Sequence, residues 1–393
     1  MWEIIIVVLI GCIVVYDFRE EVFLREQMYW FVWGLMTLMS GLAYNVGVDI
    51  MNAYQPSFEH NLPTLDQLTM QELFSSIDSF EPGYILFTSF FKTIWPSWYF
   101  MKTIYAIIVN LFIFKVIKRY TDHWFSVLLF YFILLFPQVH FGFLRQALAM
   151  VFVFMAFSMF HKKRWIWGIL LILVANLFHR SAIILLVSPL FFLISNSNKH
   201  SYIFYLIGLL FFVIFHNNII NWFPNVIESD MYLIDKYTRY TEDEERQRVF
   251  SFSLILHYLL NIGVPLFTLW LADRNGRKLN YIPEVYMLCT FLLINLYIPI
   301  FARVIPYVEI FQYLILVEFF YLIFAKFKND AVMRILKLSV ILGYLIIVGG
   351  RRYNRVVIPS AGIKSYDAYW PYTSVITKKM PPERQYLYYV RIK

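Results

Sequence analysis

Long apolar runs separated by short polar stretches dominate this chain. The runs are unbroken rather than alternating between apolar and polar positions, which indicates helices rather than strands. A membrane offers the backbone no hydrogen-bond partners, so helices are the simplest segments that can cross it, at ~20 residues each. The pattern predicts an all-α bundle of about twelve spanning helices, at residues 2–16, 28–44, 98–117, 124–138, 143–160, 165–178, 181–195, 201–215, 251–271, 282–301, 305–325 and 332–348.

Segments outside the predicted spans complete the predicted organisation. Residues 83–95 are apolar but end at Pro96, too early to cross comfortably, which predicts an interfacial or re-entrant helix. The polar segment 216–250 predicts a larger extracytoplasmic loop, in addition to the long extracytoplasmic loop at about 45–97. We therefore expect one transmembrane domain over residues 1–348 and a basic tail over residues 349–393.

Composition agrees with a membrane protein, because 60% of the residues are hydrophobic and only 15% are charged. The net charge of +8 comes from short basic clusters between apolar runs, which argues against a nucleic-acid partner. Cys12 and Cys289 lie inside apolar runs, so no disulfide framework is expected. We also expect no metal and no cofactor, since the sequence has neither paired histidines at helical spacing nor a glycine-rich phosphate loop.

The distribution of lysine and arginine predicts the orientation. Basic clusters follow the first, third, fifth, ninth and eleventh predicted spans, which places those ends in the cytoplasm. Residues 45–91 contain no lysine or arginine but six acidic residues, and are expected outside. Alternating the orientation over twelve spans also puts the basic tail outside, although lysine and arginine are usually enriched on the cytoplasmic side. A miscounted span and an external task for those cations both remain open.

Basic residues at the outer ends of the predicted spans are the main functional candidates. A charge near the bilayer centre costs roughly 2.5–3.5 kcal/mol, so such a residue commonly serves a site. Arg145 could simply extend to the membrane surface, but Gln146 beside it favours a site. His179 and Arg180 interrupt two apolar runs, where a plain polar turn is the alternative. Arg303, at the junction of two later spans, could instead be an interfacial anchor.

Carboxylates at the two ends of the long outer loop add a second set of candidates. Acidic loop residues are usually just solvated, but Glu81 stands beside a Pro-Gly corner at the membrane edge, and Asp49 begins the loop. Two arginines at one membrane face would bind a diphosphate group and stabilise the charge that develops when it leaves. A nearby histidine or carboxylate could deprotonate an attacking hydroxyl.

Several short motifs in a fixed order resemble the EpsG-like family of Wzy-type bacterial polysaccharide polymerases. They are Tyr44 to Asp49, Glu81-Pro82-Gly83-Tyr84, Arg145-Gln146 with Ala149, Phe178-His179-Arg180-Ser181, Arg303 and Pro371-Tyr372. The resemblance implies a fold like that of other lipid-sugar transferases and a site that faces the exterior of the bacterial cytoplasmic membrane. It implies transfer of a growing chain from its polyprenyl diphosphate onto an incoming lipid-linked repeat. The implied partners are these lipid-linked oligosaccharides, membrane lipids and a chain-length regulator.

Roles for individual residues are hypotheses that follow from the resemblance. Arg145 and Arg303, assisted by Arg180 and Gln146, would hold the diphosphate. His179, Glu81 and Asp49 would be the catalytic groups: His179 would assist the diphosphate or act as base, and Glu81 or Asp49 would contact the acceptor sugar. The sugars would also contact Tyr44, Tyr84 and Tyr307. One position departs from the family pattern, because Ala43 stands where relatives often carry arginine.

Two other functions fit the same residues. A flippase for lipid-linked oligosaccharides would also bury arginine in a helix bundle, but internal repeats and charges near the midplane are expected of transporters, and neither is evident. A ligase would differ from a polymerase only in its acceptor, and the sequence does not separate the two.

Overall fold

The computed structural model describes residues 1–74, 77–197, 203, 205–208, 210, 214, 259–325, 327, 330–353, 369 and 372–379. The chain forms two compact units. Unit 1 comprises residues 1–159, 166–183 and 327–393, and unit 2 comprises residues 160–165 and 184–326. Each unit is described by itself.

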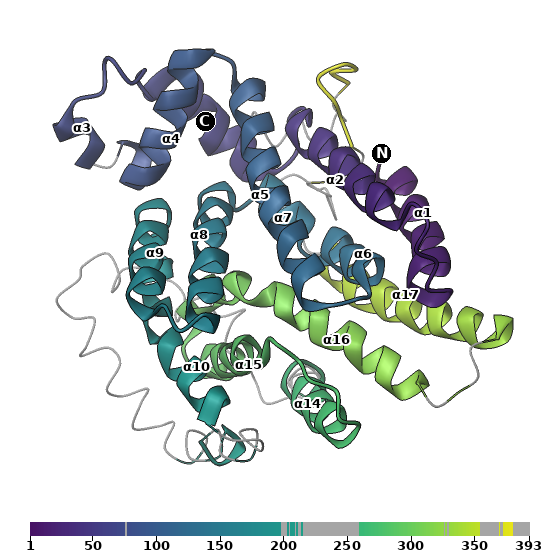
Figure 1. The fold of residues 1–393 in the computed structure, drawn as a ribbon. Helices are drawn as coiled ribbons and strands as arrows, with labels where there is room; N and C mark the ends of the chain where they lie inside the picture. The colour runs from purple at the N-terminus through teal and green to yellow at the C-terminus, as the bar shows by residue number, and fades with distance from the viewer. Residues whose placement is uncertain are drawn as a thin grey trace, which may run out of the picture. The chain divides into compact units, whose positions relative to one another are not determined.

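Most of the helices belong to unit 1 (Figure 1). They are α1 (Trp2–Cys12), α2 (Arg25–Gly41), α3 (Met70–Phe74), α4 (Pro82–Ile94), α5 (Trp98–Tyr120), α6 (Trp124–Leu134), α7 (Phe136–Phe141), α8 (Leu144–His161), α9 (Trp165–Phe178) and α17 (Ala331–Tyr353). The last residues of α8 and the first residue of α9 fall in unit 2.

Close packing of α2 on α5 forms the centre of unit 1. A Cβ atom at Gly41 would lie 2.7 Å from the side chain of Thr103, so the small residue permits the two helices to approach. The hydroxyl of Tyr29 donates to the carbonyl of Phe114 at 2.7 Å. Asp17 follows α1 and accepts hydrogen bonds from the backbone N–H and the hydroxyl of Ser126, at 2.7 and 2.8 Å. It thereby gives a partner to a backbone N–H in the first turn of α6, which has no acceptor within the helix. Farther along the chain, α17 lies along α6 (Figure 1).

The long loop after α2 is built from short helical turns rather than from irregular chain. Besides α3, it contains the π-helical turns Ile50–Tyr54 and Ser57–Asn61 and the 3₁₀ turn Ile77–Ser79. Lys92 of α4 donates to the carbonyls of Phe58 and Leu62, at 2.6 and 2.7 Å, and thereby ties α4 to the turn Ser57–Asn61. At the start of the loop, the backbone of Tyr44 donates to the carbonyl of Thr373 at 2.9 Å, so the C-terminal segment is attached there.

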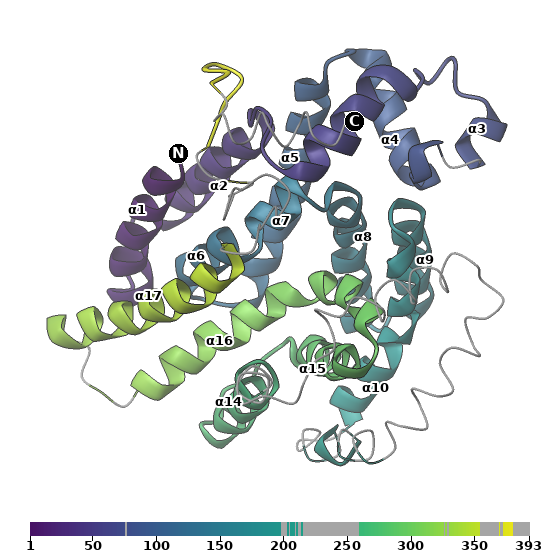
Figure 2. The same cartoon turned by 180° about the vertical axis from the view of Figure 1, so that it is seen from behind.

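Unit 2 contains α10 (Ser188–Ser197), α14 (Val264–Arg274), α15 (Ile282–Tyr297) and α16 (Glu309–Phe324), together with the 3₁₀ turns Arg180–Val187 (whose first residues belong to unit 1), Pro299–Arg303 and Ile305–Tyr307. Helix α14 packs on α16, and α10 packs on α15 (Figure 2). Two buried carboxylates of unit 2 are paired with basic side chains: Glu284 with His161 at 2.6 Å, and Glu318 with Arg277 at 2.8 Å. Pairing is what allows these groups to be buried.

The prediction of an all-helical chain is confirmed for the described residues, where the one extended feature is an isolated bridge between Ala43 and Ser374. The helix α4 covers the segment predicted as a short apolar helix. The predicted run 201–215, the loop 216–250 and the tail lie largely outside the described residues.

The prediction of twelve spans is not confirmed. Within the part of the chain that is described, three helices are long and apolar enough to cross a membrane: α5, α8 and α17. A fourth would join residues 299–307 to α16 through a bend of 69°. The predicted run 124–138 is divided near Pro137 into α6 and α7, because proline disrupts a helix interior. The run 181–195 begins as 3₁₀ helix.

Two exposed positions test the orientation predicted from the basic clusters. Asp66 lies in the acidic loop that is predicted to be outside and Lys163 in the turn between α8 and α9, and both are exposed. We expect a membrane-impermeant maleimide to label Asp66→Cys in intact cells, and to label Lys163→Cys only after permeabilisation.

The unsubstituted protein is the control, because Cys12 and Cys289 are buried and should not react. Equal labelling of both positions in intact cells would contradict the predicted orientation.

Candidate functional site

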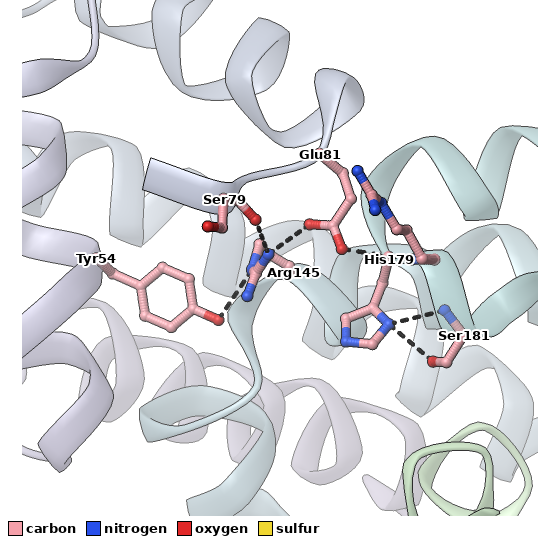
Figure 3. A network of polar contacts seen from close by, with 7 residues as sticks. Tyr54, Ser79, Glu81, Arg145, His179 and Ser181 are labelled. Atoms are coloured by element: carbon pink, nitrogen blue, oxygen red, sulfur yellow. Dashed lines mark hydrogen bonds and ion pairs between the residues drawn. The ribbon is translucent and has the colours of Figure 1, made fainter. Parts of the chain in front are cut away.

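Arg145, the second residue of α8, is the centre of a polar cluster in unit 1 (Figure 3). Its Nη1 atom lies 2.5 Å from Oε2 of Glu81 and donates to the carbonyl of Ser79 at 3.0 Å. Its Nε atom donates to the hydroxyl of Tyr54 at 3.4 Å. The side chain of Glu81 is 7% exposed and that of Arg145 24%, so the ion pair is largely shielded from solvent.

Aromatic rings surround the guanidinium group of Arg145. Its Cζ atom lies 5.0 Å from the ring centroid of Phe80 and 5.9 Å from that of Tyr54, within the range of cation–π contacts. The rings of Tyr54 and Phe80 stack at 5.6 Å, and Tyr84 meets both edge-on. Because Tyr54 and Tyr84 are both buried, they form the wall of the cluster and present little surface to a ligand.

The environment of Tyr54 connects Asp49 to the cluster. Burial raises the pKa of the Tyr54 phenol, the positive charge of Arg145 lowers it, and the negative charge of Asp49 raises it. Tyr54 therefore stays protonated at neutral pH and keeps its hydroxyl as a hydrogen-bonding group. Asp49 itself is exposed, at the start of the turn Ile50–Tyr54.

Two helix ends meet at Glu81. Glu81 stands immediately before α4, with Pro82 as the first helical residue, a position that proline favours. A Cβ atom at Gly83 would lie 2.8 Å from the carbonyl oxygen of Leu177, so the start of α4 packs against the end of α9. The second carboxylate oxygen of Glu81 consequently accepts a 3.4 Å hydrogen bond from the backbone N–H of Arg180.

His179 follows the last residue of α9 and turns its ring toward Ser181 (Figure 3). The Nδ1 atom lies 2.7 Å from the Ser181 hydroxyl and accepts a 3.3 Å hydrogen bond from the Ser181 backbone N–H. The structure thus places His179, Arg180, Glu81 and Arg145 in one cluster, although the sequence separates them by up to 99 residues.

A glycine fixes the turn that carries Asp49. Gly47 has a φ angle of +93°, and a Cβ atom there would lie 2.0 Å from the carbonyl oxygen of Phe141. No larger residue fits that position without a backbone shift. The contact holds the turn against the end of α7, four residues before Arg145 in the chain.

A strained turn supplies a site group that sequence reasoning missed. Asp78 and Ser79 have positive φ angles of 49° and 62°, a conformation that is costly for residues other than glycine. The Asp78 carboxylate holds the turn by accepting hydrogen bonds from Asn61, at 2.7 Å, and from Ser57. As a result the carbonyl of Ser79 faces Arg145. Tyr54 was missed as well, because nothing in its local sequence distinguishes it from other loop tyrosines.

The other predicted site residues have different surroundings. Gln146 follows Arg145 in the chain and is buried, and Tyr44 stacks on Tyr99 at 6.4 Å between ring centroids. Arg303 is half-buried in a 3₁₀ turn of unit 2, where Tyr307 is fully buried. Among the described side chains, no group of three or more His, Cys, Asp or Glu residues could hold a metal ion.

Comparison with protein families gives one match, to the EpsG family over residues 27–374. The matched segment includes every residue of the cluster around Arg145 and covers most of the chain. The chain belongs to the EpsG family. This is a family of Wzy-like polysaccharide polymerases, as the order of the motifs indicated. Comparisons with curated proteins and with solved structures gave no match.

The turn at Gly47 gives a stability prediction. We expect Gly47→Ala to lower the free energy of unfolding by at least about 2 kcal/mol, because the new Cβ atom combines a steric overlap with a strained φ angle. The measurement is the apparent melting temperature of the purified protein in detergent.

Gly34→Ala is the matched control, since a Cβ atom at Gly34 of α2 meets nothing within 4 Å. Alanine should be neutral or stabilising there, by up to about 1 kcal/mol. Equal melting temperatures for the two variants would show that the turn adapts and does not depend on glycine.

Proposed function

We propose that this EpsG-family chain joins polyprenyl diphosphate-linked oligosaccharide repeats at the outer face of the bacterial cytoplasmic membrane. The family membership supports a polysaccharide polymerase in general. The cluster around Arg145 supports the finer proposal, in which a lipid-linked diphosphate is the group that the protein binds.

The observation that carries the proposal is the position of the Glu81 carboxylate. One of its oxygens lies 2.5 Å from Arg145, and the other accepts from the backbone N–H of Arg180. An arginine fork and a backbone N–H at the start of a helical turn are also what a phosphate oxygen requires. We propose that the donor diphosphate takes the place of this carboxylate on Arg145.

Release of Glu81 would be coupled to substrate binding in this scheme. Leaving a shielded arginine without its partner costs free energy, so Arg145 should exchange one anion for another rather than remain unpaired. The surrounding rings of Phe80 and Tyr54 stay in contact with the guanidinium in either state. Arg303, Arg180 and Gln146 remain proposed as further diphosphate-binding residues.

The proposed reaction is a glycosyl transfer. A hydroxyl oxygen of the acceptor repeat forms a bond to the anomeric carbon of the donor chain, while the bond from that carbon to the diphosphate oxygen breaks. Polyprenyl diphosphate leaves with the bonding electron pair, and Arg145 stabilises its charge. The hydroxyl proton passes to a base, for which Asp49 is our candidate because it is exposed and within electrostatic reach of Tyr54.

Sugar contacts are proposed at the outer loop. Tyr44 is half-exposed on its stack with Tyr99 and could pack against a sugar ring. Tyr84 and Tyr307 are buried, so each would need local opening to contact a sugar directly.

We propose that the chain has twelve spans and that the site faces outward. We also propose that no nucleotide or metal cofactor takes part, since the lipid diphosphate itself supplies the activated donor.

Substitution of Arg145 tests the function. We expect Arg145→Ala to reduce chain elongation by at least about 100-fold, because the leaving diphosphate loses its main positive partner. Arg145→Lys, which keeps the charge but not the two-pronged geometry, should retain roughly a tenth of the activity. The measurement is the length profile of surface polysaccharide on a gel, at matched protein levels.

Arg164→Ala is the control, because it removes an exposed arginine from the turn that follows the far end of α8. It should leave the profile unchanged. Single repeats that remain at the cell surface in the Arg145→Ala strain support a polymerase. Lipid-linked repeats trapped on the cytoplasmic side would indicate a flippase, and normal long chains would exclude the diphosphate role of Arg145.

A further inference from the structure

The hydrogen bonds around His179 define which ring nitrogen carries a proton. A backbone N–H can only donate, and the N–H of Ser181 points at Nδ1 of His179 from 3.3 Å. The Nδ1 atom must therefore be an acceptor, with its lone pair directed at Ser181. The Ser181 hydroxyl, 2.7 Å from the same atom, then donates as well. A neutral His179 in this arrangement holds its proton on Nε2.

This protonation state limits the chemistry of His179. The Nε2 atom has no lone pair while it carries the proton, and the lone pair of Nδ1 is directed at two donors. The ring nitrogen that points away from Ser181 in Figure 3 can therefore give a hydrogen bond but cannot take a proton. A second proton on Nδ1 would face the N–H of Ser181, so the same contact disfavours the imidazolium form.

We propose that Ser181 is a positioning residue that holds His179 as a hydrogen-bond donor to the substrate anion, and that His179 is not the general base. The assignment rests on the proposed diphosphate site. Figure 3 draws His179 in the same cluster as Arg145 and Glu81, and the backbone N–H of its neighbour Arg180 donates to Glu81. In our proposal the Nε2–H of His179 reaches the diphosphate once that group has replaced Glu81. It would stabilise the leaving group together with Arg145.

The acceptor's proton then has to go to another group. Glu81 is committed to Arg145 and to the backbone of Arg180 until substrate binds. Asp49 is an exposed carboxylate at the start of the turn that ends at Tyr54, and is the group that we assign to this step. In this division the donor side of the reaction has Arg145 and His179, and the acceptor side has Asp49.

Substitutions of His179 separate a donor from a base. Glutamine can place an amide N–H near the position of Nε2–H but cannot accept a proton from a hydroxyl at neutral pH. We expect His179→Gln to retain at least roughly a tenth of kcat, and His179→Ala to lose about 100-fold, as for other removed donors. The pH profile of kcat should have the same shape in His179→Gln as in the wild type. Equal inactivity of both variants would overturn the assignment.

A double-mutant cycle tests Ser181. Ser181→Ala removes one of the two donors to Nδ1 and should lower kcat roughly ten-fold, the effect of one hydrogen bond, whereas Ser181→Thr keeps the hydroxyl and should stay near wild type. In the His179→Gln background, Ser181→Ala should have no further effect, because Ser181 acts through the imidazole. Effects that multiply would mean that Ser181 supports the fold and does not position His179.

The assay uses full-length protein in liposomes with purified lipid diphosphate-linked repeats, and protein levels are matched for every variant. A wild type that forms long chains, together with the pattern above, supports the proposal. A wild type that forms long chains while the effects of the two residues multiply overturns only the Ser181 assignment. A wild type that forms none overturns the proposed function, and this inference with it.

Discussion

The ion pair between Arg145 and Glu81 is the constraint on which the site depends. Placing a guanidinium at the start of α8, shielded from solvent, requires a partner, since an unpaired buried charge costs several kcal/mol. The partner comes from the other end of a long loop, and its position requires α4 to start where α9 ends. The same requirement explains why the carbonyl of Ser79 and the hydroxyl of Tyr54 also face Arg145.

Local strain supports this arrangement. The turns at Gly47 and at Asp78–Ser79 have positive φ angles, and each is held by a contact that leaves little freedom: a carbonyl against Gly47, and two hydrogen bonds to the Asp78 carboxylate. Glycine adopts a positive φ angle without strain, whereas Asp78 and Ser79 do not. Backbone strain of this kind is common where a protein must hold groups in one geometry before the ligand arrives. Here the strained turn lies two residues before Glu81, the carboxylate that a diphosphate would have to displace from Arg145.

The sequence singled out the charged residues of the cluster, because a charge beside an apolar run is conspicuous. Arg145, Glu81, His179 and Arg180 were selected in this way, and the structure brings them together. Tyr54 and the carbonyl of Ser79 were not predictable, since backbone groups have no sequence signal and tyrosine is abundant in this chain. The helical class followed from the length of the apolar runs, but the number of spans did not. Run length ignores a break such as Pro137, and it does not distinguish 3₁₀ from α-helix.

The departure from the family pattern at Ala43 also has a structural counterpart. The amino group of Lys102, from α5, donates to the carbonyl of Ala43 at 3.1 Å, so a lysine lies beside the position where relatives often carry arginine. Lys102 is completely buried and cannot contact a substrate, and Ala43 itself is only 1% exposed. Lys102 can therefore hold the backbone that leads to Asp49 but cannot replace an external cation. Under the proposed function, we therefore expect binding of the anionic substrate to depend heavily on Arg145, whose side chain remains partly accessible.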